Sequence, residues 1–125
     1  MVGRPRTTMV AIVSPTARDI AWAAGLYEGE GYCGFSNRTM KLALSQKDPW
    51  ILHRLRCLFG GSVWVNPTEG TGRVSQWRIF GARAHGFALT IYSYLSPRRR
   101  IQVTRMLATT SPYNNWPQQK ARRAG

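Results

Sequence analysis

Two acidic side chains lie close together in the stretch AAGLYEGEG, at residues 23–31. Glu28 and Glu30 are two of only five acidic residues in a chain with 18 lysines and arginines. Glu30 falls between two glycines, where a helix should end, so its carboxylate and nearby backbone carbonyls could face outward together. Such oxygens are the ligands that a hard divalent cation such as Mg²⁺ prefers. A second interpretation stays open, in which both acids are ordinary solvated charges at a helix end.

The helix that carries these acids has features of a contact between two chains. If a twofold axis ran beside it, two copies of Glu30 at about 5 Å would repel by about 3 kcal/mol at an effective dielectric near 20. Bound cations would offset this repulsion, and paired carboxylates of this kind hold the cations used in phosphodiester hydrolysis. Ala21, Ala24 and Gly25 would let a second helix approach closely. Packing within one chain would explain these small residues as well.

Length and charge limit the classes of protein to consider. The chain has 125 residues, enough for one core, and a formal net charge of +13, which favours a polyanionic partner and above all nucleic acid. No apolar run approaches the roughly 20 residues that span a bilayer, so no membrane partner is expected. Cys33 and Cys57 form no disulfide-rich pattern, which favours an intracellular location: the cytoplasm or nucleoid, or an organelle if the protein is encoded there.

Capping residues and periodicity predict an α+β protein. Ser14-Pro15-Thr16 should supply a cap and a first-turn proline for a helix that stops at Gly29 or Gly31, and another helix should begin at Asp48-Pro49 and stop at Gly60-Gly61. Hairpins are expected over residues 32–45 and 62–80, a helix over 83–94 with Phe87, Ile91, Tyr94 and Leu95 on its apolar side, and a last helix over about 96–107. The order is αββαββαα. We take residues 1–15 as a basic arm, 16–108 as the domain and 109–125 as a basic tail.

The predicted strands each have one apolar and one polar face. Met40, Leu42 and Leu44 alternate with polar or small neighbours in the first hairpin. An antiparallel sheet of this type packs helices on one side only. Its other face is then free to bind a partner.

The stretch Ala24-Gly25-Leu26-Tyr27-Glu28-Gly29-Glu30-Gly31 resembles the LAGLIDADG motif in its variant that ends in Gly-Glu-Gly. The resemblance extends over roughly residues 16–107 and implies the αββαββα fold of the LAGLIDADG homing endonucleases. A chain with one motif copy is similar to the homodimeric branch. In that family the motif helices pack at the interface, each supplies one metal-binding acid, and the curved sheets lie in the major groove of duplex DNA.

Site residues follow from the resemblance by position. Glu30 is implied as the metal-binding acid for Mg²⁺ or Mn²⁺, with the Gly29 carbonyl as a supporting ligand, and Ala21, Ala24 and Gly25 as the dimer interface. The segment LALSQK is similar to one that ends in a polar active-site residue, here Gln46. The segment YLSPRRR is similar to one with an active-site basic residue, here Arg98, with Arg100 as a second candidate. Arg replaces the familiar Lys at this place, and its high pKa makes it a poor proton donor or acceptor.

The predicted DNA contacts lie on the polar sheet face and around the arginine run. Strand alternation puts Trp64 and Asn66 on one face, and alignment with the family's sheet puts Gln76 and Arg78 there too. Arg and Gln can read guanine and adenine edges, whereas cations at a helix N-terminus oppose its macrodipole and point to phosphate contact. The predicted contacts are Ser36, Asn37, Arg38, Lys41, Lys47, Trp64, Asn66, Arg73, Gln76, Arg78, Arg99 and Arg100. Ordinary solvated strand residues remain the alternative for each.

These observations lead to one main hypothesis and two alternatives. The main hypothesis is a site-specific, homodimeric endonuclease that hydrolyses both strands of duplex DNA with divalent cations. A non-cleaving nucleic-acid-binding protein of the same fold, such as a transcriptional regulator or an intron RNA maturase, is the first alternative. A structural RNA-binding protein, favoured by charge alone, is the second.

Overall fold

A computed structural model describes residues 13–67 and 74–110, apart from the side chain of Ser36. Its elements are α1 (Ala17–Glu30), β1 (Gly31–Ser36), β2 (Thr39–Gln46), α2 (Pro49–Phe59), β3 (Ser62–Trp64), β4 (Ser75–Phe80), α3 (Gly81–Ile91), the 3₁₀ helix η1 (Tyr92–Tyr94) and α4 (Pro97–Thr109). This order confirms the predicted αββαββαα sequence of elements. Arg73, most of the basic arm and nearly all of the basic tail lie outside the described residues.

Local sequence signals set where the helices begin. Thr16 and Asp19 form a capping box at the start of α1: the Asp19 N–H donates to Thr16 Oγ1 at 3.2 Å, and the Thr16 N–H donates to Asp19 Oδ2 at 2.9 Å. Asp48 caps α2 by accepting from the Trp50 N–H at 3.0 Å. Ser96 caps α4 in the same manner through the Arg99 N–H. The starts of α2 and α4 were predicted from the sequence, because a cap depends on residues within one turn. Pro15 was predicted in the first turn of α1 but lies before the N-cap Thr16.

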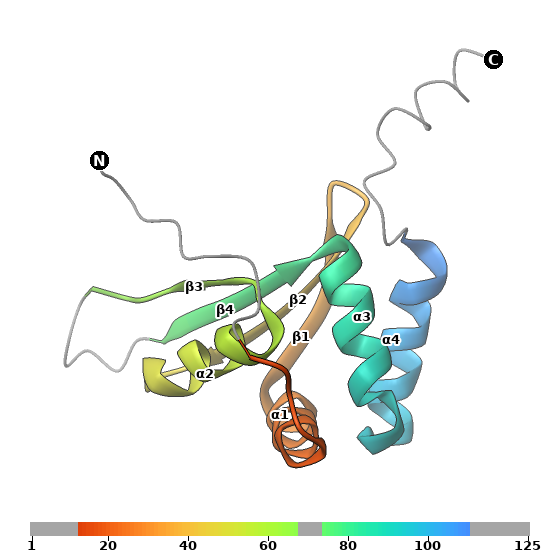
Figure 1. Ribbon diagram of the computed structural model, residues 1–125. Helices are drawn as coiled ribbons and strands as arrows, with labels where there is room; N and C mark the ends of the chain where they lie inside the picture. Colours follow the sequence, from red (N-terminus) through yellow and green to blue (C-terminus); the bar gives the residue numbers. More distant parts are fainter. Residues whose placement is uncertain (1–12, 68–73, 111–125) are drawn as a thin grey trace.

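The four strands form an antiparallel sheet in the order β1-β2-β4-β3. The described helices all lie on one side of it, with α1 under the centre, α2 under the β4 side, and α3 and α4 on the other side of α1 (Figure 1). The opposite face of the sheet carries no helix in the part of the chain that the structure describes. The predicted one-sided arrangement is therefore confirmed.

The core lies between the sheet and these helices. Five of the strand residues that face the helices are fully buried, namely Met40, Leu42, Leu44, Trp77 and Ile79. At the centre, the ring of Phe87 meets the rings of Tyr27, Phe59 and Trp77 edge to face, at centroid distances of 6.2, 4.9 and 5.2 Å. Trp77 also donates its indole N–H to the Gly60 carbonyl at 2.8 Å, so its one polar atom is satisfied in the core.

The transition from α1 to β1 depends on a glycine. The ring of Tyr27 packs directly over Gly31, where an added Cβ would come 2.2 Å from Tyr27 Cδ1. Gly31 has an extended backbone, with φ of −75° and ψ of 156°, so it is the lack of a side chain that matters here. The chain can therefore leave α1 and enter β1 immediately, which places Glu30 at the edge of the sheet.

The prediction of the helix over residues 83–94 was partly wrong. Phe87, Ile91 and Leu95 are buried as expected, but Tyr94 is 53% exposed. The α-helical geometry ends at Ile91 and the chain tightens into η1, which shifts the direction of each following side chain. No helix among the described residues has the length and apolar character needed to cross a membrane.

Candidate nuclease and DNA-binding site

Glu30 is the last residue of α1, and its side chain is exposed. Among residues 13–67 and 74–110, nothing donates a hydrogen bond or forms an ion pair with its carboxylate. A negative charge at a helix C-terminus is opposed by the macrodipole, so this position stabilises nothing within the chain. Gly31 pairs with Leu44 across the β1–β2 ladder, which brings the end of β2 at Gln46 beside the end of α1. The two polar residues predicted for the site are therefore neighbours in the fold.

Glu28 has a different environment from Glu30. Its carboxylate accepts hydrogen bonds from the Ser96 N–H at 2.9 Å and from the Ser96 hydroxyl at 2.7 Å. These bonds hold the pKa of Glu28 below its usual value, with smaller contributions from nearby arginines. The interpretation of Glu28 as a solvated charge is thus wrong, because the residue fastens α1 to the start of α4.

The arginine run at the start of α4 divides into different roles. Arg98 is exposed over 64% of its side chain, and its Nη2 lies 4.0 Å from Glu28 Oε2. Arg99 is buried: its Nε donates to the Glu28 carbonyl at 3.0 Å, its Nη1 donates to Gln102 at 3.0 Å, and its guanidinium lies 5.2 Å from the Tyr27 ring centroid. The prediction that Arg99 contacts DNA is contradicted, because the side chain is buried and its guanidinium is held by Glu28, Gln102 and the Tyr27 ring.

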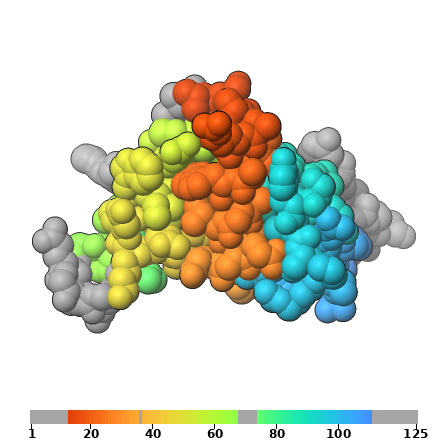
Figure 2. Space-filling model, turned by 90° about the horizontal axis from the view of Figure 1, so that it is seen from below, coloured from red at the N-terminus to blue at the C-terminus, as the bar shows by residue number. Residues whose placement is uncertain are grey.

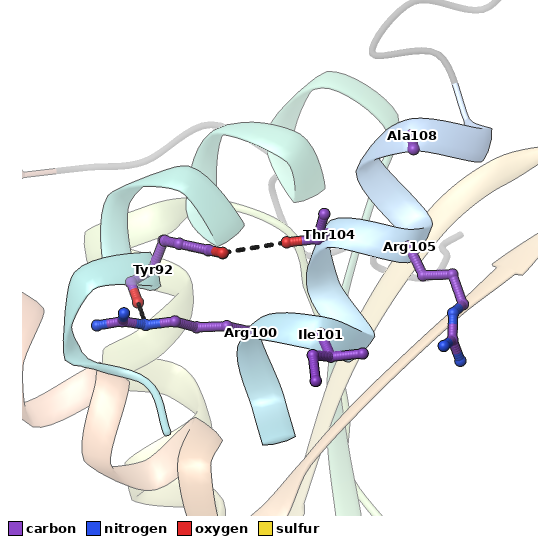
Figure 3. Close-up of a pocket in the computed structure, with 6 residues that line it drawn as sticks. All are labelled: Tyr92, Arg100, Ile101, Thr104, Arg105 and Ala108. Atoms are coloured by element: carbon purple, nitrogen blue, oxygen red, sulfur yellow. Dashed lines mark hydrogen bonds between the residues drawn. The ribbon is translucent and has the colours of Figure 1, made fainter. Parts of the chain in front are cut away.

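Arg100 also turns toward its own chain. Figure 3 shows it extended along a shallow pocket of about 310 Å³ on the outer side of α4, with its guanidinium at the end of η1. Its Nε donates to the Tyr92 carbonyl at 3.2 Å and its Nη2 to the Ser93 carbonyl at 2.7 Å. Arg100 thus donates to two carbonyls of η1, and the Tyr92 carbonyl also accepts from the Leu95 N–H at 3.1 Å. Arg98 is the arginine of this run that remains exposed for the site.

The sheet register places the predicted DNA contacts on the open face. Gln76 pairs with Ser45 and Trp64, and Arg78 pairs with Ala43 and Ser62, so all of these side chains point away from the helices. Lys41 is on the same face of β2. Asn37 and Arg38 form the β1–β2 turn, Lys47 is exposed between β2 and α2, and Asn66 follows β3. Their contact with DNA stays a prediction.

Two exposed aromatic residues on this face were missed from the sequence. Tyr32 is 54% exposed, leans over Gly34, and lies 5.8 Å from Lys41 Nζ. Phe80 is 43% exposed and pairs with Lys41 from the other side. Strand alternation in residues 31–36 and 75–80 was the signal that could have found both.

The exposed face of α1 stands between α2 and the segment that leads into α4 (Figure 2). Ala21, Gly25 and Gly29 are exposed on it, and a Cβ added at Gly25 or Gly29 would meet nothing within 4 Å. Packing within the chain therefore does not require these glycines. Ala24, in contrast, is only 2% exposed and belongs to the core with Ala23 and Tyr27. Its predicted place in a dimer interface is contradicted, because the helical turn directs it toward the sheet.

One chain supplies few ligands for a metal ion. The described residues contain no group of three or more His, Cys, Asp or Glu side chains that could hold one. Mg²⁺ is commonly bound through one or two carboxylates with water completing the shell. Glu30 and the Gly29 carbonyl fit such a cation if a second chain contributes the second carboxylate.

The chain is similar to solved structures but not to any known family by sequence. No family model and no curated protein sequence matches the chain. Among solved structures, the homing endonuclease I-CvuI bound to its target in the presence of 2 mM Ca matches with a TM-score of 0.55. The same endonuclease bound to the I-CreI target in the presence of 2 mM Mg, with the DNA not cleaved, matches with a TM-score of 0.56.

Sequence identity is 18% in both cases, and the match covers 70% of this chain. The chain spans 62% of the length of the I-CvuI chain. A likeness at this identity concerns the arrangement of elements, which is also the arrangement that the motif at residues 24–31 implies. This chain therefore has the LAGLIDADG homing-endonuclease fold.

Proposed function

We propose that the chain is a site-specific DNA endonuclease that acts as a homodimer and hydrolyses both strands of a duplex with divalent cations, Mg²⁺ or Mn²⁺. The observation that carries the proposal is Glu30, an exposed carboxylate without a partner in the described residues, placed where the motif helix meets the sheet. Such an unpaired acid is hard to explain as a stabilising group in so basic a chain.

Dimerisation would complete the site. The exposed small residues Ala21 and Gly25 allow a second copy of α1 to approach, with Gly29 continuing the same face toward Glu30. Two chains packed in this manner would bring two copies of Glu30 together, each beside a Gly29 carbonyl. Their mutual repulsion would favour cation binding there.

The remaining residues would act on the scissile phosphates. A bound divalent cation supplies charge stabilisation and a more acidic water. Gln46, at the end of β2, would orient water or phosphate by hydrogen bonding. Arg98 would neutralise phosphate charge rather than carry a proton. The open sheet face, on a chain of net charge +13, would lie along the duplex.

Plasmid cleavage tests this proposal. Supercoiled plasmids that carry a target library would be incubated with the wild-type protein or with Glu30→Gln, in Mg²⁺ or Mn²⁺. We expect the variant to lose at least about 100-fold in cleavage rate, the scale on which loss of a transition-state stabilising group acts. Unchanged binding of the same target by both proteins would serve as the control for folding. Equal cleavage would remove Glu30 from the reaction.

A non-cleaving nucleic-acid-binding protein of this fold is the second candidate. The contact of Arg98 with Glu28 at 4.0 Å favours it, because an arginine that shares its charge with a neighbouring acid is less available to a phosphate. This candidate, a transcriptional regulator or an intron RNA maturase, predicts tight binding without hydrolysis in Mg²⁺. Competition between duplex DNA and structured RNA distinguishes a transcriptional regulator from an RNA maturase. The same measurement tests the alternative of a structural RNA-binding protein.

A further inference from the structure

Three polar side chains on the open sheet face form a chain of hydrogen bonds. The Gln76 amide nitrogen donates to Ser45 Oγ at 3.3 Å, and its amide oxygen accepts from Arg78 Nε at 2.5 Å. Ser45 lies opposite Gln76 in the β2–β4 pairing, and Arg78 is two residues further along the same face of β4. All three side chains are half-buried, so these hydrogen bonds are partly protected from water.

Gln76 uses both the oxygen and the nitrogen of its amide in these hydrogen bonds. To read an adenine, a glutamine must present its oxygen and its nitrogen together to the base edge. Here the amide oxygen faces Arg78 and the amide nitrogen faces Ser45. The side of the amide that would bind adenine is therefore directed along the sheet. The two contacts also fix which way the amide points, because the reverse orientation would put its N–H₂ group against the guanidinium.

Arg78 is held at one nitrogen and left open at the others. Nε is occupied by Gln76, whereas its Nη1 and Nη2 have no hydrogen bond or ion pair in the described parts of the chain. Its neighbours across the sheet are Ala43 and Ser62, which are small and leave room above them. A guanidinium fixed through Nε presents its two terminal nitrogens as a fork, which matches the O6 and N7 acceptors of guanine in the major groove.

We propose that Arg78 determines specificity by reading one guanine in each half-site, and that Gln76, itself held by Ser45, is a positioning residue that orients Arg78. This inference rests on the proposed binding of duplex DNA by the open face. It differs from the expectation that Gln76 itself contacts a base. Preorganisation is the physical reason for the arrangement, since a guanidinium held in place loses less rotamer entropy when it binds.

Selection from a randomised duplex library tests the assignment. The full-length chain would be assayed without Mg²⁺, so that bound duplexes stay intact, and the base preference at each position would be obtained by sequencing. Wild type should show one position per half-site at which guanine is preferred by about 10-fold or more, the scale of a good bidentate contact. Arg78→Lys keeps the charge but loses the fork, and should abolish this preference alone.

Two substitutions of Gln76 separate positioning from folding. Gln76→Met keeps the length of the side chain without the acceptor, and should lower the guanine preference at this position. Gln76→Glu restores an acceptor for Arg78 Nε, and the Ser45 hydroxyl can donate to its other oxygen, so the preference should return. Equal melting temperatures of the two variants would show that the difference is not one of folding.

The outcomes distinguish this inference from the proposed function. If the wild type binds no duplex specifically, both are overturned. If it binds specifically and the guanine preference survives Arg78→Lys, the role of Arg78 is overturned alone. If Arg78→Lys abolishes the preference but Gln76→Met does not, the positioning role of Gln76 is overturned.

Discussion

The carboxylate of Glu28 accepts hydrogen bonds from both the backbone N–H and the hydroxyl of Ser96, at 2.9 and 2.7 Å. Ser96 is the N-cap of α4, so one acid of the motif helix anchors the start of another helix. The Arg99 side chain adds another hydrogen bond between the two helices by donating to the Glu28 carbonyl at 3.0 Å. Of the two acids in the Glu-Gly-Glu sequence, the first therefore builds the junction and the second remains exposed.

This junction should make stability depend on pH in the acid range. The pKa of Glu28 is lowered in the folded chain from its ordinary value of 4.5, mainly by the Ser96 hydrogen bonds. The unfolded chain then binds more protons, so the stabilisation is fully present above pH 4.5 and is lost as the pH falls below this value through the folded pKa. Thermal unfolding measured across this range should show a smaller pH dependence in Glu28→Gln. Parallel pH profiles for wild type and Glu28→Gln would contradict the assignment.

Asp19 provides the control for that experiment. Its pKa is also lowered, first by the Thr16 backbone N–H and then by Arg54, so it contributes stability in the same direction. Asp19→Asn should remove a separate part of the acid-range dependence. The double variant should lose both parts additively, because the two sites share no partner in the hydrogen bonds of the described residues.

Truncation of two adjacent arginines should affect different properties: Arg99→Ala the stability, and Arg98→Ala the cleavage of DNA. Arg99→Ala removes a buried guanidinium that donates to Glu28 and Gln102, and should lower the free energy of unfolding by about 1.5–3 kcal/mol. Arg98→Ala should change it by less than about 0.5 kcal/mol, because the side chain is largely exposed. DNA cleavage should instead fall with Arg98→Ala. Urea unfolding alongside the plasmid assay separates the two effects, and destabilisation by Arg98→Ala would show that our division of roles is mistaken.

Two glycines at the motif helix should likewise differ. Gly31→Ala places a methyl group against the Tyr27 ring, an overpacking that should cost about 1–3 kcal/mol of unfolding free energy. Gly25→Ala meets nothing within 4 Å and should stabilise α1 in the monomer by up to about 1 kcal/mol. If α1 packs on a second copy, Gly25→Ala should also weaken dimerisation. Sedimentation velocity at several concentrations measures this, and an unchanged dissociation constant would argue against α1 as the contact.

The β1–β2 turn holds a strained arginine. Asn37 and Arg38 have φ of 54° and 67°, a left-handed pair suited to a two-residue hairpin but unfavourable for Arg. Arg38→Gly should stabilise the fold by roughly 1 kcal/mol. If Arg38 contacts a phosphate, the same change should reduce the log–log salt slope of duplex binding by about 1, from about −7 for a complex that neutralises about 8 phosphates. A salt titration in which the slope is unchanged would exclude that contact.

Much of the fold could be predicted from local sequence patterns. Asp48 and Ser96 marked the starts of α2 and α4 because an N-cap is decided within a few residues. Alternation in the strands predicted which side chains face the helices, and the register agrees for Leu42 and Leu44. The prediction failed at Tyr94, because the α-helical geometry ends at Ile91 and η1 changes the direction of the side chains that follow.

The sequence by itself determined the element order, the one-sided sheet and the place of Glu30 at the end of a helix. Only the tertiary structure decided which charged groups are available. It paired Glu28 with Ser96, buried Arg99 against Tyr27, directed Ala24 into the core and joined Gln76 to Ser45. The physical reason is range: caps and periodicity act between near neighbours, whereas the partner of a polar side chain depends on which distant segment folds beside it.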